Sequence, residues 1–219
     1  MPGYTVETTR FHIGADDYDI RALSNRQQYA DADGLAERAG ISSAAWPLFG
    51  VVWPAGLALA EEMSTFAVAG KHILEIGCGL GLSSLVLARR GADITACDRH
   101  PLAEGFLRHN TDLNGLPPIP YRSAAWEGPN DELGHFDLIL GSDLLYERDH
   151  PALLCGFIAQ HAYPVAEVLL ADPGRGYCAQ FSERMAAEGY TLTERWLHFA
   201  LSDKPASQGR MLSYVRGHA

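Results

Sequence analysis

From residue 71 onward, short runs of apolar residues alternate with segments whose apolar residues recur every three or four positions. The short runs predict buried strands, and the periodic segments predict helices. The predicted strands are Ile73–Gly77, Asp93–Asp98, Ile119–Ala124, Phe136–Asp143 and Ala166–Asp172, and the predicted helices are Leu82–Arg90, Pro101–Asn114, His150–His161 and Tyr177–Glu188. This alternation predicts a mostly parallel sheet with helices on both faces.

The two ends of the chain follow a different pattern. Tyr190–Phe199 and Arg210–Arg216 are extended runs joined by a polar segment, which predicts an antiparallel hairpin. Near the start, Thr5–Ile13 and Tyr18–Leu23 flank a turn-forming stretch and predict a second hairpin. Polar sequence from 24 to 43 predicts a loop or short helix, and an aromatic stretch then leads into a helix after a proline.

These elements combine into one predicted architecture. We expect an α/β fold with a Rossmann-like, seven-stranded and mostly parallel sheet, a C-terminal antiparallel hairpin and helices on both faces. An N-terminal β-hairpin extension covers residues 1–45, and the main domain covers residues 46–219. A chain of 219 residues is long enough for one domain with a substantial core.

Charge and cysteine usage narrow the possible partners. The net charge is −10 and the pI is about 5.3, without a basic run anywhere. Nucleic acid is disfavoured as a partner because affinity for it rests on Lys and Arg. The cysteines (Cys78, Cys97, Cys155 and Cys178) show no C-x-x-C pair, which indicates buried, reduced thiols in a cytoplasmic protein. The histidines lack metal-ligand spacing, so no metal is expected, and neither a membrane span nor a signal peptide is predicted.

A glycine-rich turn is the centre of the predicted site. The first predicted strand breaks into Gly77, Cys78, Gly79 and Gly81, and a helical pattern follows at once. This geometry lets backbone N–H groups and a helix N-terminus meet a nucleotide-like ligand. The spacing G-x-G-x-G differs from the dinucleotide fingerprint, and no P-loop lysine follows. Glu75, two residues before the first glycine, favours a cationic ligand over a pyrophosphate.

Two later positions fit the same kind of ligand. Asp98 ends the next predicted strand, where a carboxylate can accept both hydroxyls of a ribose. Its alternative role is to cap the following helix. Trp126 follows the third predicted strand, where an aromatic ring can lie against an adenine face, and its alternative is a core position.

The pattern Glu-x-Gly-x-Gly-x-Gly resembles motif I of the class I S-adenosylmethionine-dependent methyltransferases, whose cofactor carries a sulfonium and an ammonium group. After the fourth predicted strand, Asp143-Leu-Leu-Tyr146 resembles the Asp-x-x-Tyr motif of the family 16 (seven-strand) protein lysine methyltransferases. Residues 52–60 resemble the N-terminal Trp segment of that family, and residues 125–128 resemble its Trp-Gly motif, here interrupted by a glutamate. Residues 171–175 resemble the branch that methylates the β subunit of electron transfer flavoprotein.

The resemblance implies an enzyme that binds S-adenosylmethionine and methylates a lysine of a protein substrate. Asp143, which also contacts the cofactor, would hold the incoming ammonium, and Tyr146 would orient the amine. Their alternatives are a helix cap and a core position. Trp53 would cover the cofactor, or serve as a core anchor. Asp172 and Arg175 would face the substrate, or form a tight turn around Pro-Gly.

Two other functions stay open. A small-molecule N- or O-methyltransferase would use the Trp-rich segment to close a pocket. A non-catalytic S-adenosylmethionine-binding module would be expected to lack Asp143 or Tyr146, and both are present.

Overall fold

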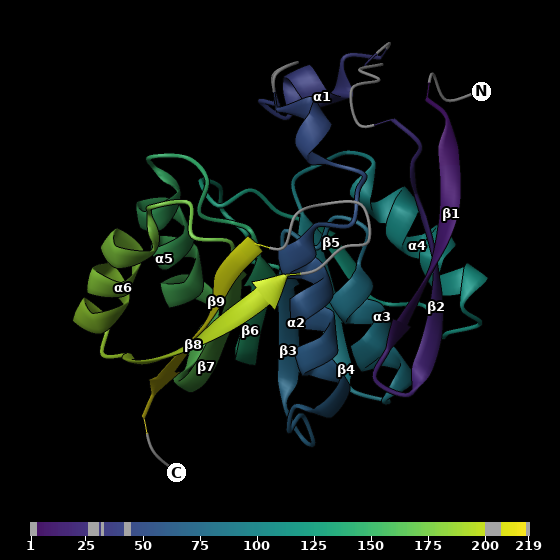
Figure 1. Ribbon diagram of the computed structural model, residues 1–219. Coiled ribbons are helices and arrows are strands. Elements are labelled where there is room, and N and C mark those ends of the chain that lie inside the picture. Colours follow the sequence, from purple (N-terminus) through teal and green to yellow (C-terminus); the bar gives the residue numbers. More distant parts are fainter. Residues whose placement is uncertain (1–3, 26–30, 32, 42–44, 200–206, 218–219) are drawn as a thin grey trace.

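Residues 4–25, 31, 33–41, 45–199 and 207–217 are described by a computed structural model (Figure 1). Parts of the predicted polar loop, and residues 200–206 of the predicted connection before the last strand, lie outside the described residues. Within the polar segment, α1 (Leu35–Arg38) is a single helical turn. In the aromatic stretch that follows, η1 (Trp46–Leu48) is a 3₁₀ turn. The predicted helix that follows is α2 (Pro54–Thr65), which has proline in its first turn, where a missing N–H costs nothing.

The main sheet has the predicted seven strands within the described residues. They are β3 (His72–Ile76), β4 (Asp93–Asp98), β5 (Tyr121–Ser123), β6 (Phe136–Ser142), β7 (Ala162–Asp172), β8 (Thr191–Phe199) and β9 (Ser207–Arg216). Their order is β5-β4-β3-β6-β7-β9-β8. Strands β3 to β7 are parallel, and β9 pairs antiparallel with both β7 and β8. The strand order therefore reverses between β3 and β6, which places a ligand crevice outside the carboxyl ends of these two strands.

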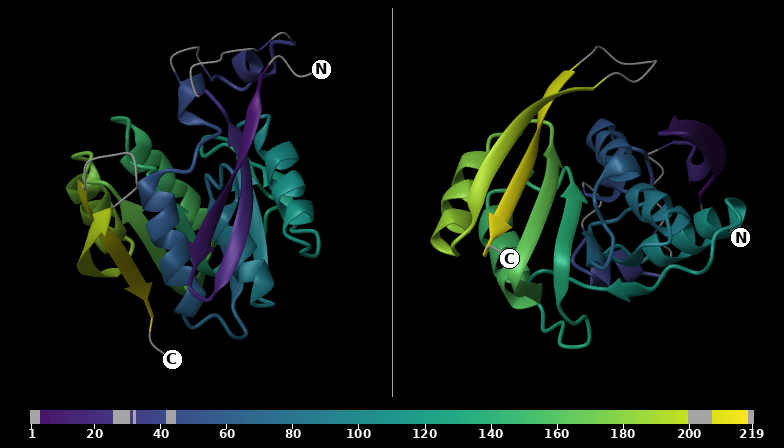
Figure 2. Two further views of the ribbon diagram at one scale, coloured as in Figure 1. Left: turned by 45° about the vertical axis from the view of Figure 1, so that its right-hand side comes forward. Right: turned by 90° about the horizontal axis from the view of Figure 1, so that it is seen from below.

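Helices cover both faces of the sheet, as Figures 1 and 2 show. On one face lie α2, α3 (Leu82–Arg89) and α4 (Ala103–Leu113), and on the other lie α5 (His150–His161) and α6 (Cys178–Ala187). The central strand β6 shows why its sequence is a continuous apolar run. Leu138 and Leu140 pack in the core on the α2 side, whereas Ile139 packs in the core on the α5 side.

The predicted N-terminal hairpin is confirmed and packs against the rest of the molecule. Strands β1 (Val6–Ile13) and β2 (Asp16–Leu23) pair antiparallel around a turn at Gly14 and Ala15, so the predicted turn was two residues too long. Ile13, Tyr18, Ile20 and Leu23 are almost fully buried and share one core cluster with α2, α3 and α4. The boundary at residue 45 stays a prediction, but the hairpin and the main domain share this core.

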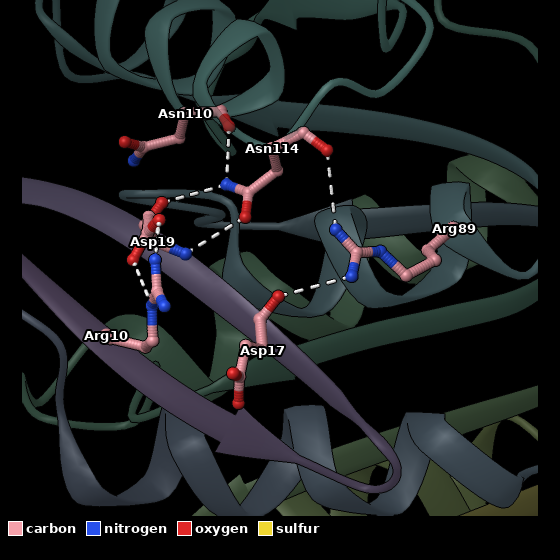
Figure 3. Close-up of polar contacts among 6 residues, drawn as sticks. All are labelled: Arg10, Asp17, Asp19, Arg89, Asn110 and Asn114. Atoms are coloured by element: carbon pink, nitrogen blue, oxygen red, sulfur yellow. Dashed lines mark hydrogen bonds and ion pairs between the residues drawn. The ribbon is translucent and has the colours of Figure 1, made fainter.

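Polar contacts fix the hairpin to α3 and α4 (Figure 3). Asn114 exchanges two hydrogen bonds with the backbone of Asp19, at 2.9 and 2.8 Å. Arg89 donates to the backbone oxygens of Asp17 and Asn114, and Arg10 pairs with the Asp19 carboxylate on the outer face of the hairpin. The hairpin is therefore held by polar contacts at its edge as well as by its buried face.

Among the strand boundaries that differ from the prediction, the starts of β7 and β5 are explained by prolines. Strand β7 begins at Ala162, directly after α5, and the register between β6 and β7 shifts between Phe136 and Leu138, which accommodates Pro164 within the strand. Strand β5 begins at Tyr121 rather than residue 119, because Pro120 lacks the N–H that a ladder needs. The four cysteines are free and buried, as predicted. Among the described residues no helix has the length and apolarity needed to cross a bilayer.

Candidate functional site

A cavity of about 310 Å³ opens beside the carboxyl ends of β3, β4 and β6. Ten residues singled out from the sequence line it: Trp53, Glu75, Gly77, Cys78, Gly79, Asp98, Trp126, Asp143, Tyr146 and Arg175. Gly81 and Asp172 are not among its lining residues. The structure thus brings most of the predicted site to one place, while the role of each residue as a ligand or catalyst remains a prediction.

The glycine turn after β3 contains residues with two different tasks. Gly79 has a φ of 53°, and a Cβ atom at this position would meet no protein atom within 4 Å. It therefore leaves open space at the cavity wall. Gly81 has a φ of 79°, and a Cβ there would lie 2.2 Å from a methyl carbon of Leu107. Gly81, directly before α3, therefore allows the close approach of the Leu107 side chain of α4.

Asp98 is held at the end of β4 by two backbone donors. Its Oδ2 accepts from Gly79 N at 2.9 Å, and its Oδ1 accepts from His100 N at 2.8 Å. The residue that precedes α4 is Leu102, so Asp98 does not cap this helix. Burial raises the pKa of Asp98. Each carboxylate oxygen keeps a free acceptor site, and the predicted contact with two ribose hydroxyls is compatible with this geometry.

Glu75 lies below the glycine turn, with 4% of its surface exposed. Its Oε2 accepts hydrogen bonds from the backbone N–H of Ser84, at 2.9 Å, and from the Ser84 hydroxyl. Both donors belong to the first turn of α3, where the helix dipole favours an anion. Burial nevertheless raises the pKa of Glu75 to about 7. A cation bound in the cavity would favour the ionised carboxylate, so the site suits a positively charged ligand.

Aromatic side chains form the outer walls of the cavity. The indole N–H of Trp53 donates to Leu48 O at 3.0 Å, which fixes the ring against the segment before α2. Trp126 is half-buried, and its ring meets that of His150 edge to face, with centroids 5.1 Å apart. Trp46 and Phe49 are buried, and Phe49 also lines the cavity. Trp126 packs against the α5-side core, so the core and cavity roles coexist for this residue.

His100 is a lining residue that sequence reasoning missed. Its ring stacks on Phe49 with centroids 3.8 Å apart, and its Nδ1 accepts from Leu102 N at 3.2 Å. Burial lowers the pKa of His100 to about 3, so the ring is neutral with its proton on Nε2. His100 follows Asp98 by two residues, and this closeness to a predicted site residue could have marked it as part of the cavity wall.

Asp143 occupies a conformation that few side chains adopt. Its φ of 53° makes it the one non-glycine residue with positive φ in the described part of the chain, and Asp tolerates this region better than most. Its N–H donates to Ala171 O at 2.9 Å, at the end of β7. The residue that precedes α5 is Asp149, so Asp143 is not a helix cap. The loop instead directs the Asp143 carboxylate into the cavity.

Arg175 pairs with the Asp143 carboxylate, and Tyr146 lines the same cavity. Arg175 Nε lies 2.5 Å from Oδ1, and its Nη2 lies 2.8 Å from Oδ2, which makes a bidentate ion pair. Tyr146 is half-buried with its ring against His150, at 4.4 Å between centroids. Burial raises the pKa of Tyr146, and its hydroxyl therefore stays protonated as a hydrogen-bond donor at neutral pH.

The structure separates the two residues predicted to face the substrate. Asp172 is 1% exposed, and its Oδ1 accepts from Gly174 N at 2.6 Å and from Arg175 N at 3.3 Å. These bonds build the tight turn after β7, which was the alternative role for this motif. Arg175 reaches the cavity from that turn. Asp172 thus supports the loop, whereas Arg175 is placed to act in the site.

Sequence comparison relates this chain to enzymes that modify proteins. A family model described as lysine methyltransferase matches residues 43–177. A protein N-lysine methyltransferase of Danio rerio is 36% identical over 153 residues, which cover 64% of this chain and 69% of the relative. The electron transfer flavoprotein beta subunit lysine methyltransferase of Danio rerio is 32% identical over 167 residues, covering 72% of this chain and 59% of that relative. The electron transfer flavoprotein branch, which residues 171–175 resemble, is thus among the matched relatives.

Solved structures show the same fold at low sequence identity. Magnesium protoporphyrin IX methyltransferase from Synechocystis PCC 6803, solved with bound S-adenosylmethionine, aligns with a TM-score of 0.57 at 19% identity, over 74% of this chain and 78% of that chain. A putative S-adenosylmethionine-dependent methyltransferase from Streptococcus mutans aligns with a TM-score of 0.67 at 10% identity, over 95% of this chain and 55% of that chain. These likenesses concern the fold.

Proposed function

This chain belongs to the lysine methyltransferase family of S-adenosylmethionine-dependent enzymes, and from that premise we propose that it methylates the side-chain amine of a lysine in a protein substrate through Asp143 and Tyr146. One observation carries the proposal. Asp143 and Tyr146 follow β6, the strand next to the glycine-turn strand β3, and line the same cavity as Glu75 and Asp98.

The residues of the cavity fit the cofactor. The open wall at Gly79 admits a ligand close to the backbone, and the Asp98 carboxylate has free acceptor sites for ribose hydroxyls. Glu75 provides a carboxyl group whose ionised form a bound cation would stabilise. Trp53 and Trp126 offer apolar ring faces. When bound, S-adenosylmethionine supplies a methyl group that is already electrophilic because it is attached to a sulfonium.

The protein must therefore align the acceptor amine and keep water away. Asp143 holds the amine through a charge-assisted hydrogen bond, and Tyr146 orients it with a protonated hydroxyl or with its ring face. A lysine amine has an ordinary pKa of about 10.4 and must lose a proton before it can act as a nucleophile. The apolar and aromatic side chains that line the cavity, among them Trp53 and Trp126, favour alignment of the amine with the methyl group over reaction with water.

Partner and compartment form part of the same proposal. A negative net charge of −10 suits a neutral or basic protein better than a nucleic acid. Four unpaired, buried thiols support a cytoplasmic location. A small-molecule acceptor is the second candidate, because Leu48, Val52 and Trp53 form an apolar cover over one side of the cavity.

Replacing Asp143 with Asn tests the proposal. Asn tolerates the positive φ of this position, so Asp143→Asn removes the charge without the strain that alanine would add. The enzyme is incubated with labelled S-adenosylmethionine and a cell extract, and labelled proteins are identified by mass spectrometry. We expect wild type to label lysines of an extract protein, and Asp143→Asn to lose at least a hundredfold in rate while cofactor affinity stays within about threefold.

Asp149→Asn is the matched control. Asp149 is an exposed residue of the same loop, and its side chain makes no capping hydrogen bond to α5. Its substitution should leave both labelling and cofactor affinity unchanged. Label in nucleic acid, or only in small molecules, would contradict the protein-lysine proposal. Equal loss of transfer and cofactor binding in Asp143→Asn would contradict the role given to Asp143.

A further inference from the structure

The Asp143 carboxylate is already paired with a cation of its own chain. Both of its oxygens accept hydrogen bonds from Arg175, at 2.5 and 2.8 Å. The Asp143 side chain is 9% exposed and the Arg175 side chain 40% exposed, so the pair sits at the cavity wall with its carboxylate on the inner side. Bidentate guanidinium–carboxylate contacts of this kind are among the strongest polar contacts in proteins.

The loop after β7 is built to direct Arg175 toward this carboxylate. Asp172 accepts from the backbone N–H groups of Gly174 and Arg175, which fixes the turn from inside. Gly174 and Gly176 on either side of Arg175 have φ values of 85° and 93°, which side chains rarely adopt. Asp143 N–H is in turn bonded to Ala171 O, at the start of the same turn. The pair therefore joins two ordered backbone segments, unlike a contact between two mobile surface chains.

An unpaired carboxylate at Asp143 would work against the chemistry. A negative group beside a lysine favours the charged ammonium and raises the pKa of the amine above its ordinary value of about 10.4. The ammonium has no lone pair and cannot attack a methyl group. A carboxylate neutralised by a guanidinium can still accept a hydrogen bond from the amine, but it no longer holds the proton on it.

We propose that Arg175 is a positioning residue that neutralises Asp143, so that the substrate lysine is held in the site as a neutral amine at physiological pH. The inference rests on the proposed lysine methylation and adds how the acceptor is activated. The ammonium first releases its proton to water. The nitrogen lone pair then forms the new N–C bond as the C–S bond breaks, and S-adenosylhomocysteine and a methylated ammonium result.

Other charged groups near the pair do not replace Arg175. Those that line the cavity or act electrostatically on Asp143, Tyr146 or Arg175 are Glu75, Asp98, Arg99, His100, Glu127, Glu147, His150 and Asp172. Most of them are acidic, and His100 is neutral because burial lowers its pKa to about 3. Arg99, the other arginine of the cavity, lies after β4 beside Asp98. Among the described residues, Arg175 is the cation with hydrogen bonds to Asp143.

The test compares Arg175→Gln with Arg175→Lys across the pH scale. The acceptor is the purified extract protein that wild type labels. The value of kcat is measured with saturating acceptor from pH 5 to 10, because kcat reports groups in the bound complex. We expect Arg175→Gln to move the pH midpoint of the rise in kcat up by about one unit and to lower kcat by up to about tenfold at pH values below the wild-type midpoint, without a higher KM. Arg175→Lys keeps the charge and should stay near the wild-type midpoint.

Two controls separate the possible failures. Arg148→Gln removes an exposed arginine of the β6–α5 loop and should change neither the midpoint nor kcat. Cofactor affinity, measured without acceptor, should be the same in all variants, which shows that the cavity is intact. An unchanged midpoint with a lower KM in Arg175→Gln would mean that Arg175 merely competes with the lysine, and would overturn the inference. A wild-type enzyme that binds the cofactor but labels no protein would instead refute the proposed function.

Discussion

Glu75 combines burial with a place next to a ligand cavity, and this makes its protonation state sensitive to ligand charge. Burial raises the pKa of its carboxyl group to about 7, so in the free protein it is largely neutral below that pH. A cationic ligand favours the ionised form, so binding must expel a proton below pH 7. We expect the affinity for S-adenosylmethionine to rise up to tenfold per pH unit from pH 6 to pH 7 and to level off above it, as measured by calorimetric titration.

Glu75→Gln is the matched variant for this pH effect. Glutamine keeps the size of the side chain and can still accept a hydrogen bond from Ser84, but it stays neutral at every pH. The variant should bind S-adenosylmethionine more weakly at pH 8 and with an affinity that hardly changes between pH 6 and 8. His100 does not interfere, because its pKa of about 3 keeps it neutral across this range. A wild-type affinity that is flat with pH would rule out Glu75 as the titrating group.

At the scale of single residues, sequence reasoning found positions more reliably than contacts. The apolar run of β6 predicted where this strand ends, and the resemblance of the residues after it to the Asp-x-x-Tyr motif assigned Asp143 and Tyr146 to the site. The Asp143–Arg175 pair joins residues 32 positions apart through a loop conformation, and no local pattern encodes that pairing. The same holds for Gly81, whose need for close packing appears only when Leu107 of α4 is in place.

At the scale of secondary-structure elements, α4 connects the hairpin to the glycine turn through one buried side chain. Asn110 is fully buried, and its Oδ1 accepts from Arg21 N at 2.8 Å. Its Nδ2 donates to Leu80 O in the glycine turn at 3.1 Å, and to Arg21 O at 3.3 Å. We expect Asn110→Ala to lower the free energy of unfolding by about 1–3 kcal/mol, because it leaves buried backbone groups unpaired. Cofactor affinity should also fall, since the turn loses a support, and urea unfolding and calorimetry measure the two effects.

Asn114, the residue that directly follows α4, provides the comparison. It exchanges hydrogen bonds with Asp19 of the hairpin and has no hydrogen bond to the glycine turn. Asn114→Ala should therefore lower stability while leaving cofactor affinity unchanged. Equal affinity in both variants would show that the Asn110–Leu80 bond does not shape the cavity.

Element boundaries were predictable where apolar periodicity and end signals agree. The bounds of β4 and α5 match the sequence prediction, because apolar runs end there at charged or turn-forming residues. The predicted strand begins at Ala166, whereas β7 begins at Ala162 and includes Pro164, a residue that is unfavourable within a strand. A register shift against β6 absorbs that proline, and such a shift depends on the partner strand rather than on local sequence.

At the scale of the whole molecule, the alternating pattern predicted the sheet and its hairpin but could not define how the N-terminal segment packs. Parallel strands joined by helices restrict the topology to few arrangements, and the structure shows the one in which the strand order reverses between β3 and β6. No comparable topology rule predicts where the N-terminal hairpin packs. Its amphipathic strands show that one face must be buried, but the covering element, α4, is far away in sequence.

Deleting residues 1–25 tests whether the hairpin is an appendage or part of the main core. Ile13, Tyr18, Ile20 and Leu23 are at most 2% exposed and pack with apolar side chains of α2, α3 and α4. Each contributes about 1.5–3 kcal/mol, and their sum is comparable to the ~5–15 kcal/mol that stabilises a typical domain. We expect residues 26–219 alone to be insoluble or to lack a cooperative thermal transition. Ile20→Ala should lower the free energy of unfolding by ~2–5 kcal/mol, whereas Thr8→Ala on the exposed face should leave it unchanged. A deletion variant that melts cooperatively at the wild-type temperature would show that the domain begins after the hairpin.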